Sequence, residues 1–256
     1  MRDPLSQIPE GSTDKFVVAN TVKGKQKITG EQYVKGIVSS KPEICTPLSD
    51  YVQSNESLKR VRKSVDRSLA YLDQHLTALQ GSGTATFGVL QGSQFAEERR
   101  RSAQETAKRE VAGFSIEGLG CGEPSREFGT LLTASLQHLP AEKPRLLHGT
   151  VSPLQILRAV ELGVDLFDGS YPLVISELGE ALVFSFAGVL GEQQQQYKLN
   201  LWDAVYSRDK GPLVAGCTCY TCKTHTRAYV HHLLNTRELL APVLLMRFAS
   251  SSSFFS

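Results

Sequence analysis

The chain has 256 residues, of which 41% are hydrophobic and 21% charged, and its 28 Lys and Arg against 26 Asp and Glu give a formal net charge of +2. These fractions exclude a disordered chain, a collagen and an unbroken coiled coil, and the balanced charge excludes long-range attraction as the main route to nucleic acid. Five cysteines are too few for a disulfide scaffold, and three of them fall within six positions, which favours a metal site in a reduced compartment.

No stretch approaches the ~18 consecutive apolar residues of a membrane span, and the first residues lack the apolar core of a signal peptide. The apolar run at residues 239–246 is short, and Pro242 interrupts it. We therefore expect a soluble, cytoplasmic protein with no transmembrane segment.

Short strands and helices alternate up to residue 168. The clearest helix is expected around residues 58–76, because apolar residues recur there every three or four positions and Ser54 or Asn55 can cap its start. Another helix begins after the cap Ser152, with Pro153 in its first turn and Gly163 beyond its end. The expected strands span residues 15–19, 42–48, 84–90, 112–117, 143–148 and 164–167. The other expected helices span residues 30–40, 95–109 and 125–139.

This alternation repeats about every thirty residues, which is typical of βαβ units and a parallel sheet. No Gly-x-Gly-x-x-Gly motif follows a first strand, so a dinucleotide-binding fold loses support. The leading fold class is therefore α/β, an incomplete (β/α)8 TIM-type barrel, with function expected at the carboxyl ends of its strands. Residues at those ends are Asp50, Gln91, Glu117, His148 and Asp168.

The pattern changes after residue 168. An antiparallel hairpin is expected from strands at 173–175 and 181–186, and a helix is expected at about 225–240. We expect a partial barrel over residues 1–190 and a zinc-binding subdomain over residues 191–256.

The strongest chemical signal is the Cys-x-Cys-x-x-Cys motif of Cys217, Cys219 and Cys222. It places three thiolates on one turn, close enough to share a tetrahedral ion, with zinc the default. The alternative is that the three cysteines are unrelated, half-buried thiols that bind no metal. His225, His231 and His232 follow closely, but they fit a helix face or a cap better than a cramped fourth ligand position.

A basic stripe lies opposite the apolar face of the helix at 58–76. On its own it is a solvated helix face, with contact to RNA phosphates as the alternative. Its members are Lys59, Arg60, Arg62, Lys63 and Arg67. Asp168 ends the last barrel strand, where a carboxylate can act as a nucleophile or simply form a turn.

Five ordered motifs together resemble the tRNA-guanine transglycosylase family. They lie at residues 87–92, 143–149 and 163–168, at the three cysteines, and at residues 226–233. The resemblance implies a zinc-bearing barrel that exchanges guanine in a tRNA anticodon for a queuine-type base. Within that family the chain looks most like the eukaryotic accessory subunits, which are non-catalytic and pair with a catalytic subunit.

Three departures from the family pattern shape the expected activity. Asp168 matches the position of the family's nucleophile, but the apolar residues of 172–177 replace the cations that hold tRNA in active members, so Asp168 is expected to be vestigial. The family's fourth zinc ligand is a histidine expected at position 248, where this chain has Phe248, so one zinc ion would be held by three thiolates only. Both ends of the chain look truncated relative to the family.

The resemblance therefore implies a non-catalytic accessory subunit that forms a heterodimer with a catalytic queuine tRNA-ribosyltransferase subunit and meets tRNA through the complex. A homodimer is the alternative assembly. Other functions left open are an active transglycosylase with Asp168 as nucleophile and a stand-alone zinc-dependent RNA-binding module. The resemblance also implies peripheral association with the mitochondrial outer membrane.

Overall fold

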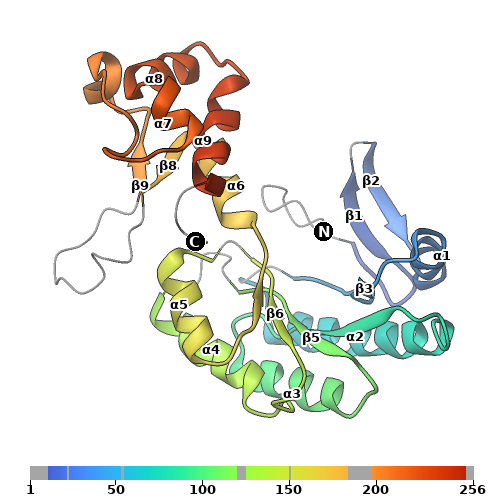
Figure 1. Ribbon diagram of the computed structural model, residues 1–256. Helices are drawn as coiled ribbons and strands as arrows, with labels where there is room; N and C mark the ends of the chain where they lie inside the picture. Colours follow the sequence, from blue (N-terminus) through green and yellow to red (C-terminus); the bar gives the residue numbers. More distant parts are fainter. Residues whose placement is uncertain are drawn as a thin grey trace. The chain divides into compact units, whose positions relative to one another are not determined.

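The computed structural model describes residues 11–21, 23–52, 55–119, 125–149, 151–183 and 198–251 (Figure 1). The chain divides into two compact units, residues 1–168 and residues 169–256. The boundary expected near residue 190 lies outside the described residues. Among the described helices, none combines the length and the apolar composition that crossing a bilayer requires.

The first unit is built on a five-stranded parallel sheet in the order β3-β4-β5-β6-β7. Its strands are β3 (Ile44–Cys45), β4 (Ala85–Leu90), β5 (Gly113–Ile116), β6 (Arg145–Leu147) and β7 (Leu166–Phe167). The helices that connect them are α2 (Leu58–Ala78), α3 (Ala96–Ala107), α4 (Ser125–Leu136) and α5 (Pro153–Glu161). These helices lie on one face of the curved sheet (Figure 1), as in part of a (β/α) barrel. The predicted incomplete barrel is confirmed.

The sequence patterns explain where these helices begin. In α5, the Ser152 side chain accepts a hydrogen bond from the backbone N–H of Gln155, and Pro153 occupies the first turn, as predicted. In α2, the predicted cap was wrong by two or three residues, because Ser57 rather than Ser54 or Asn55 caps the helix.

The core of this unit lies between the sheet and its helices, where Leu90, Phe114 and Ile116 are fully buried against Phe128 and Leu132. The close fit leaves no room for a side chain at Gly88, because a Cβ there would approach the Cγ2 of Thr106 to 2.4 Å. The sheet therefore packs closely against α3 at this position.

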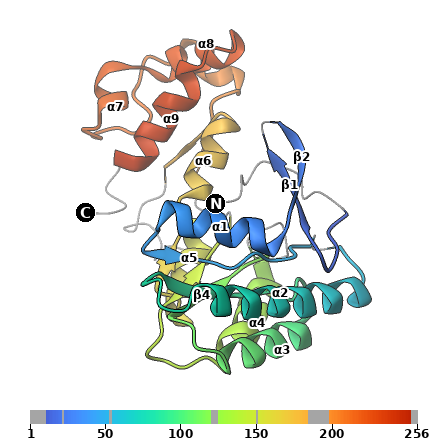
Figure 2. The same ribbon diagram turned by 90° about the vertical axis from the view of Figure 1, so that its right-hand side faces the viewer.

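An antiparallel hairpin precedes the sheet and is formed by β1 (Val17–Thr21) and β2 (Gly24–Ile28). It is followed by α1 (Gly30–Ser40), which starts with a capping box between Thr29 and Gln32. Figure 2 shows the hairpin projecting away from the five-stranded sheet. The strand at 15–19 and the helix at 30–40 were predicted, whereas β2 was not.

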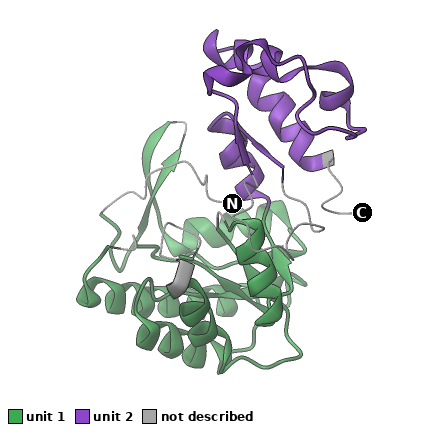
Figure 3. Ribbon diagram, turned by 90° about the vertical axis from the view of Figure 1, so that its left-hand side faces the viewer, with its two compact units in different colours: residues 1–168 green, residues 169–256 purple. Residues whose placement is uncertain are grey.

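The second unit, purple in Figure 3, is smaller and mostly helical. Its helices are α6 (Ser170–Glu177), α7 (Tyr220–Thr224), α8 (Arg227–Asn235) and α9 (Leu240–Ser251), with a short 3-10 helix at Ala204–Arg208. Its two strands, β8 (Glu180–Leu182) and β9 (Lys198–Asn200), pair antiparallel. Residues of α8 and α9 form its apolar core together with Ala181, Leu201 and Leu213.

Two predictions for this unit were wrong. Residues 173–175 belong to α6 rather than to a strand, because Pro172 is tolerated in the first helical turn and the run of apolar residues that follows fits either structure. The single helix expected at 225–240 is two helices, because the chain turns at Arg237, whose φ is +56°.

Candidate functional site

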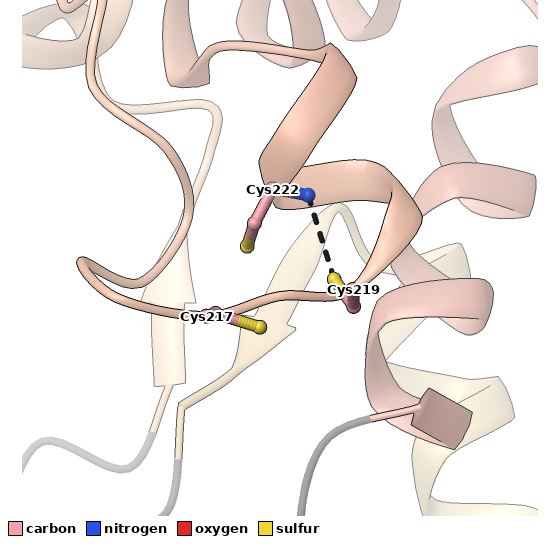
Figure 4. A group of neighbouring side chains, drawn as sticks. All are labelled: Cys217, Cys219 and Cys222. Carbon is pink, nitrogen blue, oxygen red and sulfur yellow. Dashed lines mark hydrogen bonds between the residues drawn. The ribbon is translucent and has the colours of Figure 1, made fainter.

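The second unit holds a cluster of three cysteines, shown in Figure 4. The sulfurs of Cys217, Cys219 and Cys222 all lie within 4.8 Å of one another. Cys219 caps the start of α7, so the helix itself brings Cys222 back toward Cys219, and the N–H of Cys222 donates a hydrogen bond to the Cys219 sulfur at 3.4 Å. A tetrahedral zinc ion with Zn–S bonds of about 2.3 Å places its sulfurs about 3.8 Å apart, so small side-chain movements would bring the three sulfurs to an ion. The arrangement could hold a metal.

Partial burial and the neighbouring thiols favour the protonated form of Cys222. The pKa of Cys222 is raised to about 12, first because burial disfavours the thiolate and also because of hydrogen bonds to Cys217 and Cys219. Metal binding to this cluster would therefore displace protons, and metal affinity would rise with pH.

No fourth ligand joins the cysteine cluster among the residues that the structure describes. Phe248 is 1% exposed and belongs to the apolar core against which the three cysteines pack. His225 stacks on Tyr229 with the ring centroids 5.1 Å apart, and His231 has one ring nitrogen on the carbonyl of Leu201 and the other beside Asn235. The site offers three thiols packed against an apolar core.

The first unit gathers polar side chains at the carboxyl ends of its strands. The Asp168 side chain, 8% exposed, accepts hydrogen bonds on Oδ2 from Nδ1 of His148 at 3.1 Å and from the N–H of Gly149 at 3.3 Å. The hydrogen bond with Asp168 raises the pKa of His148 against the opposing effect of burial, and the charge of Glu117 raises it further. The aspartate is thus held by groups of its own chain.

Glu117 is the centre of a second hydrogen-bonded set at the strand ends. Its Oε2 accepts hydrogen bonds from the side-chain amide of Gln91 at 3.1 Å and from the hydroxyl of Ser49 at 3.3 Å. Four of the five predicted strand-end residues therefore lie in two hydrogen-bonded sets, Gln91 with Glu117 and His148 with Asp168, and the charge of Glu117 acts on His148. We call these four residues and Ser49 the strand-end site.

Comparison with known proteins settles the family. The family profile described as queuine tRNA-ribosyltransferase matches residues 4–248. The chain belongs to this family. The resemblance drawn from the five sequence motifs is confirmed.

Several accessory subunits are similar over nearly the whole chain. It is 39% identical over 285 residues to queuine tRNA-ribosyltransferase accessory subunit 2 of Homo sapiens, an alignment that covers 96% of this chain and 69% of that protein. The accessory subunit 2 of Xenopus tropicalis is 36% identical over 282 residues (95% and 68%), and that of Anopheles gambiae is 37% identical over 259 residues (95% and 59%).

In this family member, the fifth predicted strand-end residue, Asp50, forms ion pairs with α2. Asp50 is fully buried, and its two carboxylate oxygens each accept a hydrogen bond of 2.8 Å from Arg60. Arg67 donates to the same carboxylate at 2.9 Å and also to Asp14 at 2.6 Å. Asp50 therefore anchors the start of α2.

The basic stripe of α2 contains arginines that form ion pairs within the chain and lysines that are exposed. Arg60 and Arg67 bind Asp50, and Arg62 binds Glu98 at 3.1 Å. Lys59 and Lys63 are exposed. Contact between this stripe and tRNA stays a prediction. Because Lys59 and Lys63 are exposed, they are better placed than the arginines to contact RNA phosphates.

Sequence reasoning missed Arg99, which is fully buried at the strand ends. Its guanidinium donates to the carbonyl oxygens of Ser93 and Gly118, each at 2.7 Å, and to that of Glu117 at 3.2 Å. Gly92 permits this approach, because a Cβ there would lie 2.6 Å from the backbone nitrogen of Arg99. Three adjacent arginines at 99–101 follow Glu97 and Glu98, a pattern that indicates pairing across a helical turn and does not mark the first arginine as buried.

Proposed function

We propose that the chain is a non-catalytic accessory subunit of a heteromeric tRNA-guanine transglycosylase. It would act with a catalytic queuine tRNA-ribosyltransferase subunit that exchanges guanine for queuine at the wobble position of the anticodon. The names and identities of the accessory subunits support this proposal.

The observation that carries the non-catalytic role is the environment of Asp168. Its Oδ2 is engaged by His148 and Gly149, and residues 170–177 contain no lysine or arginine that could hold a tRNA phosphate. A nucleophile attacks the anomeric carbon of a ribose only if the substrate is positioned against it, and loss of that positioning removes a large part of the rate. The Asp168 carboxylate would therefore be present in the chain but would not catalyse base exchange.

Zinc would have a structural role in the proposed subunit. Cys217, Cys219 and Cys222 would hold the ion as thiolates, and an exogenous ligand such as water would complete the coordination. An ion of this kind would fix the start of α7 against the apolar core of the second unit.

The proposed setting is a heterodimer in the cytoplasm, with tRNA bound by the assembled complex. Lys59 and Lys63 would contribute phosphate contacts from α2. A homodimer is the competing assembly, and sedimentation of the chain alone and with the catalytic subunit separates the two.

The test is base exchange by purified proteins, followed as incorporation of labelled guanine into tRNA. The chain alone should show no exchange, the catalytic subunit should become active or more active when the chain is added, and Asp168→Asn should leave that stimulation unchanged. Exchange by the chain alone that disappears in Asp168→Asn would overturn the proposal, and so would a chain that neither binds nor stimulates the catalytic subunit.

A further inference from the structure

We propose that the β1–β2 hairpin is a phosphate-binding surface, in which Lys15, Lys23, Lys25 and Lys27 contact the tRNA backbone. This inference rests on the proposed function for the identity of its partner. It assigns RNA contact to a segment in which the sequence predicted only a strand at residues 15–19.

The charge of the hairpin is unlike that of the rest of the chain. Residues 15–28 contain four lysines and no acidic residue, which makes +4, whereas the whole chain carries +2 and the remainder therefore sums to −2. A local excess of this size attracts a polyanion even when the whole protein is nearly neutral.

The four lysines are exposed, and no ion pair between described residues involves them. Lys25 and Lys27 are two positions apart on β2, so their side chains point to the same face of the hairpin about 6.8 Å apart. The Nζ of Lys27 lies 4.8 Å from the centre of the Phe16 ring, which steadies its side chain. This spacing suits neighbouring phosphates of a single strand.

The base of the hairpin is fixed to α2. Arg67 donates to the carbonyl oxygen of Ser12 at 2.9 Å and to the carboxylate of Asp14 at 2.6 Å, and the Tyr71 hydroxyl donates to the carbonyl of Thr13 at 3.2 Å. Because Asp14, which precedes Lys15, is paired with Arg67, it does not compete for the hairpin lysines. Arg67 thus anchors the lysine-bearing strands.

Composition favours RNA over a lipid surface. Peripheral membrane segments add apolar anchors to their basic residues. The exposed hairpin residues are polar, and no large hydrophobic side chain is exposed among the described residues between 11 and 29. RNA needs no such anchor, since phosphate contacts alone supply non-specific affinity.

The experiment measures binding of fluorescently labelled tRNA to the full chain at several salt concentrations. In Lys25→Gln/Lys27→Gln we expect affinity to fall on the order of 10-fold at 0.1 M salt, and the slope of log K against log salt to decrease by about 1.4–1.8. The control Lys108→Gln/Lys210→Gln removes the same charge from two exposed positions elsewhere and should change affinity by less than about 2-fold.

Equal losses in the two variants, or no loss in the hairpin variant, would overturn the inference. Salt-dependent binding of the chain to phosphatidylserine vesicles, lost in the hairpin variant while tRNA binding persists, would instead assign the surface to lipid. Co-purification with the catalytic subunit is measured in parallel. If that association fails while the hairpin effect remains, the proposed function is wrong and the RNA surface stands.

Discussion

Replacing Phe248 by histidine tests whether the cysteine cluster is a metal site with one ligand missing. Phe248 lies one helical turn after Leu244, whose carbonyl accepts a hydrogen bond from the Thr221 hydroxyl at 2.9 Å, so it shares the face of α9 that packs on α7. A histidine there would point toward the core that the three cysteines contact. We expect Phe248→His to convert a three-ligand site into a closed one.

The magnitude follows from the size of a structural zinc site. Four protein ligands give apparent binding free energies of about 10–16 kcal/mol, or about 3 kcal/mol for each ligand. Allowing for the water that the imidazole displaces, we expect a gain of about 2 kcal/mol, which is about 30-fold in affinity. Without metal the same substitution replaces a buried phenyl ring by a buried imidazole, so the apoprotein should lose about 3 kcal/mol of stability.

The assay is competition for Zn²⁺ with a chelating dye at fixed pH, together with the absorption spectrum of the Co²⁺-loaded protein, which reports the donor set. Phe248→Leu is the matched control, since it also removes the ring but supplies no donor. The reasoning is refuted if Phe248→His binds Zn²⁺ no more tightly than Phe248→Leu, or if the Co²⁺ spectra of the two variants are the same.

Three other outcomes are expected in the first unit. Asp50→Ala should lower the free energy of unfolding by about 3 kcal/mol in urea titrations, because it leaves two partly buried guanidinium groups without their carboxylate. The control Asp66→Ala breaks an exposed ion pair and should lower the free energy of unfolding by less than about 1 kcal/mol. The raised pKa of His148 means that its protonated form adds stability below about pH 6.5, and this stability is lost as pH rises through the raised pKa. The difference in unfolding free energy between wild type and His148→Gln should therefore shrink with rising pH. A difference that stays constant with pH would contradict this. Arg99→Met should destabilise by about 3 kcal/mol or more and speed hydrogen exchange at residues 117–119, and unchanged exchange there would show that the guanidinium does not hold that loop.

The barrel portion was predictable because its signals are local. Apolar periodicity marked α2, and the Ser152–Pro153 start marked α5. β2 was missed because its sequence, Gly-Lys-Gln-Lys-Ile, has no apolar alternation, and only the antiparallel pairing with β1 makes it a strand. The helix α6 was read as a strand because a short apolar run has no distinguishing period.

The candidate sites were predictable as positions but not as contacts. The rule that function collects at strand ends placed Glu117, His148 and Asp168 in one region, and the structure pairs His148 with Asp168. The partner of Arg60 could not be predicted, because Asp50 lies ten positions earlier on a loop whose path depends on the folded sheet. The spacing of charged residues along α2 indicates which face of the helix is polar. It does not indicate which basic side chains form ion pairs within the chain.

The burial of Arg99 has a consequence for sequence variation around the strand ends. Three of the oxygens that it binds, at Ser93, Glu117 and Gly118, are backbone carbonyls, and the Ser135 hydroxyl is a further acceptor at 3.5 Å. Replacing the side chains at 93 and 117 would therefore leave these hydrogen-bond acceptors in place. A guanidinium anchored in this way lets the side chains around the strand ends change while the loops that carry them keep the same course.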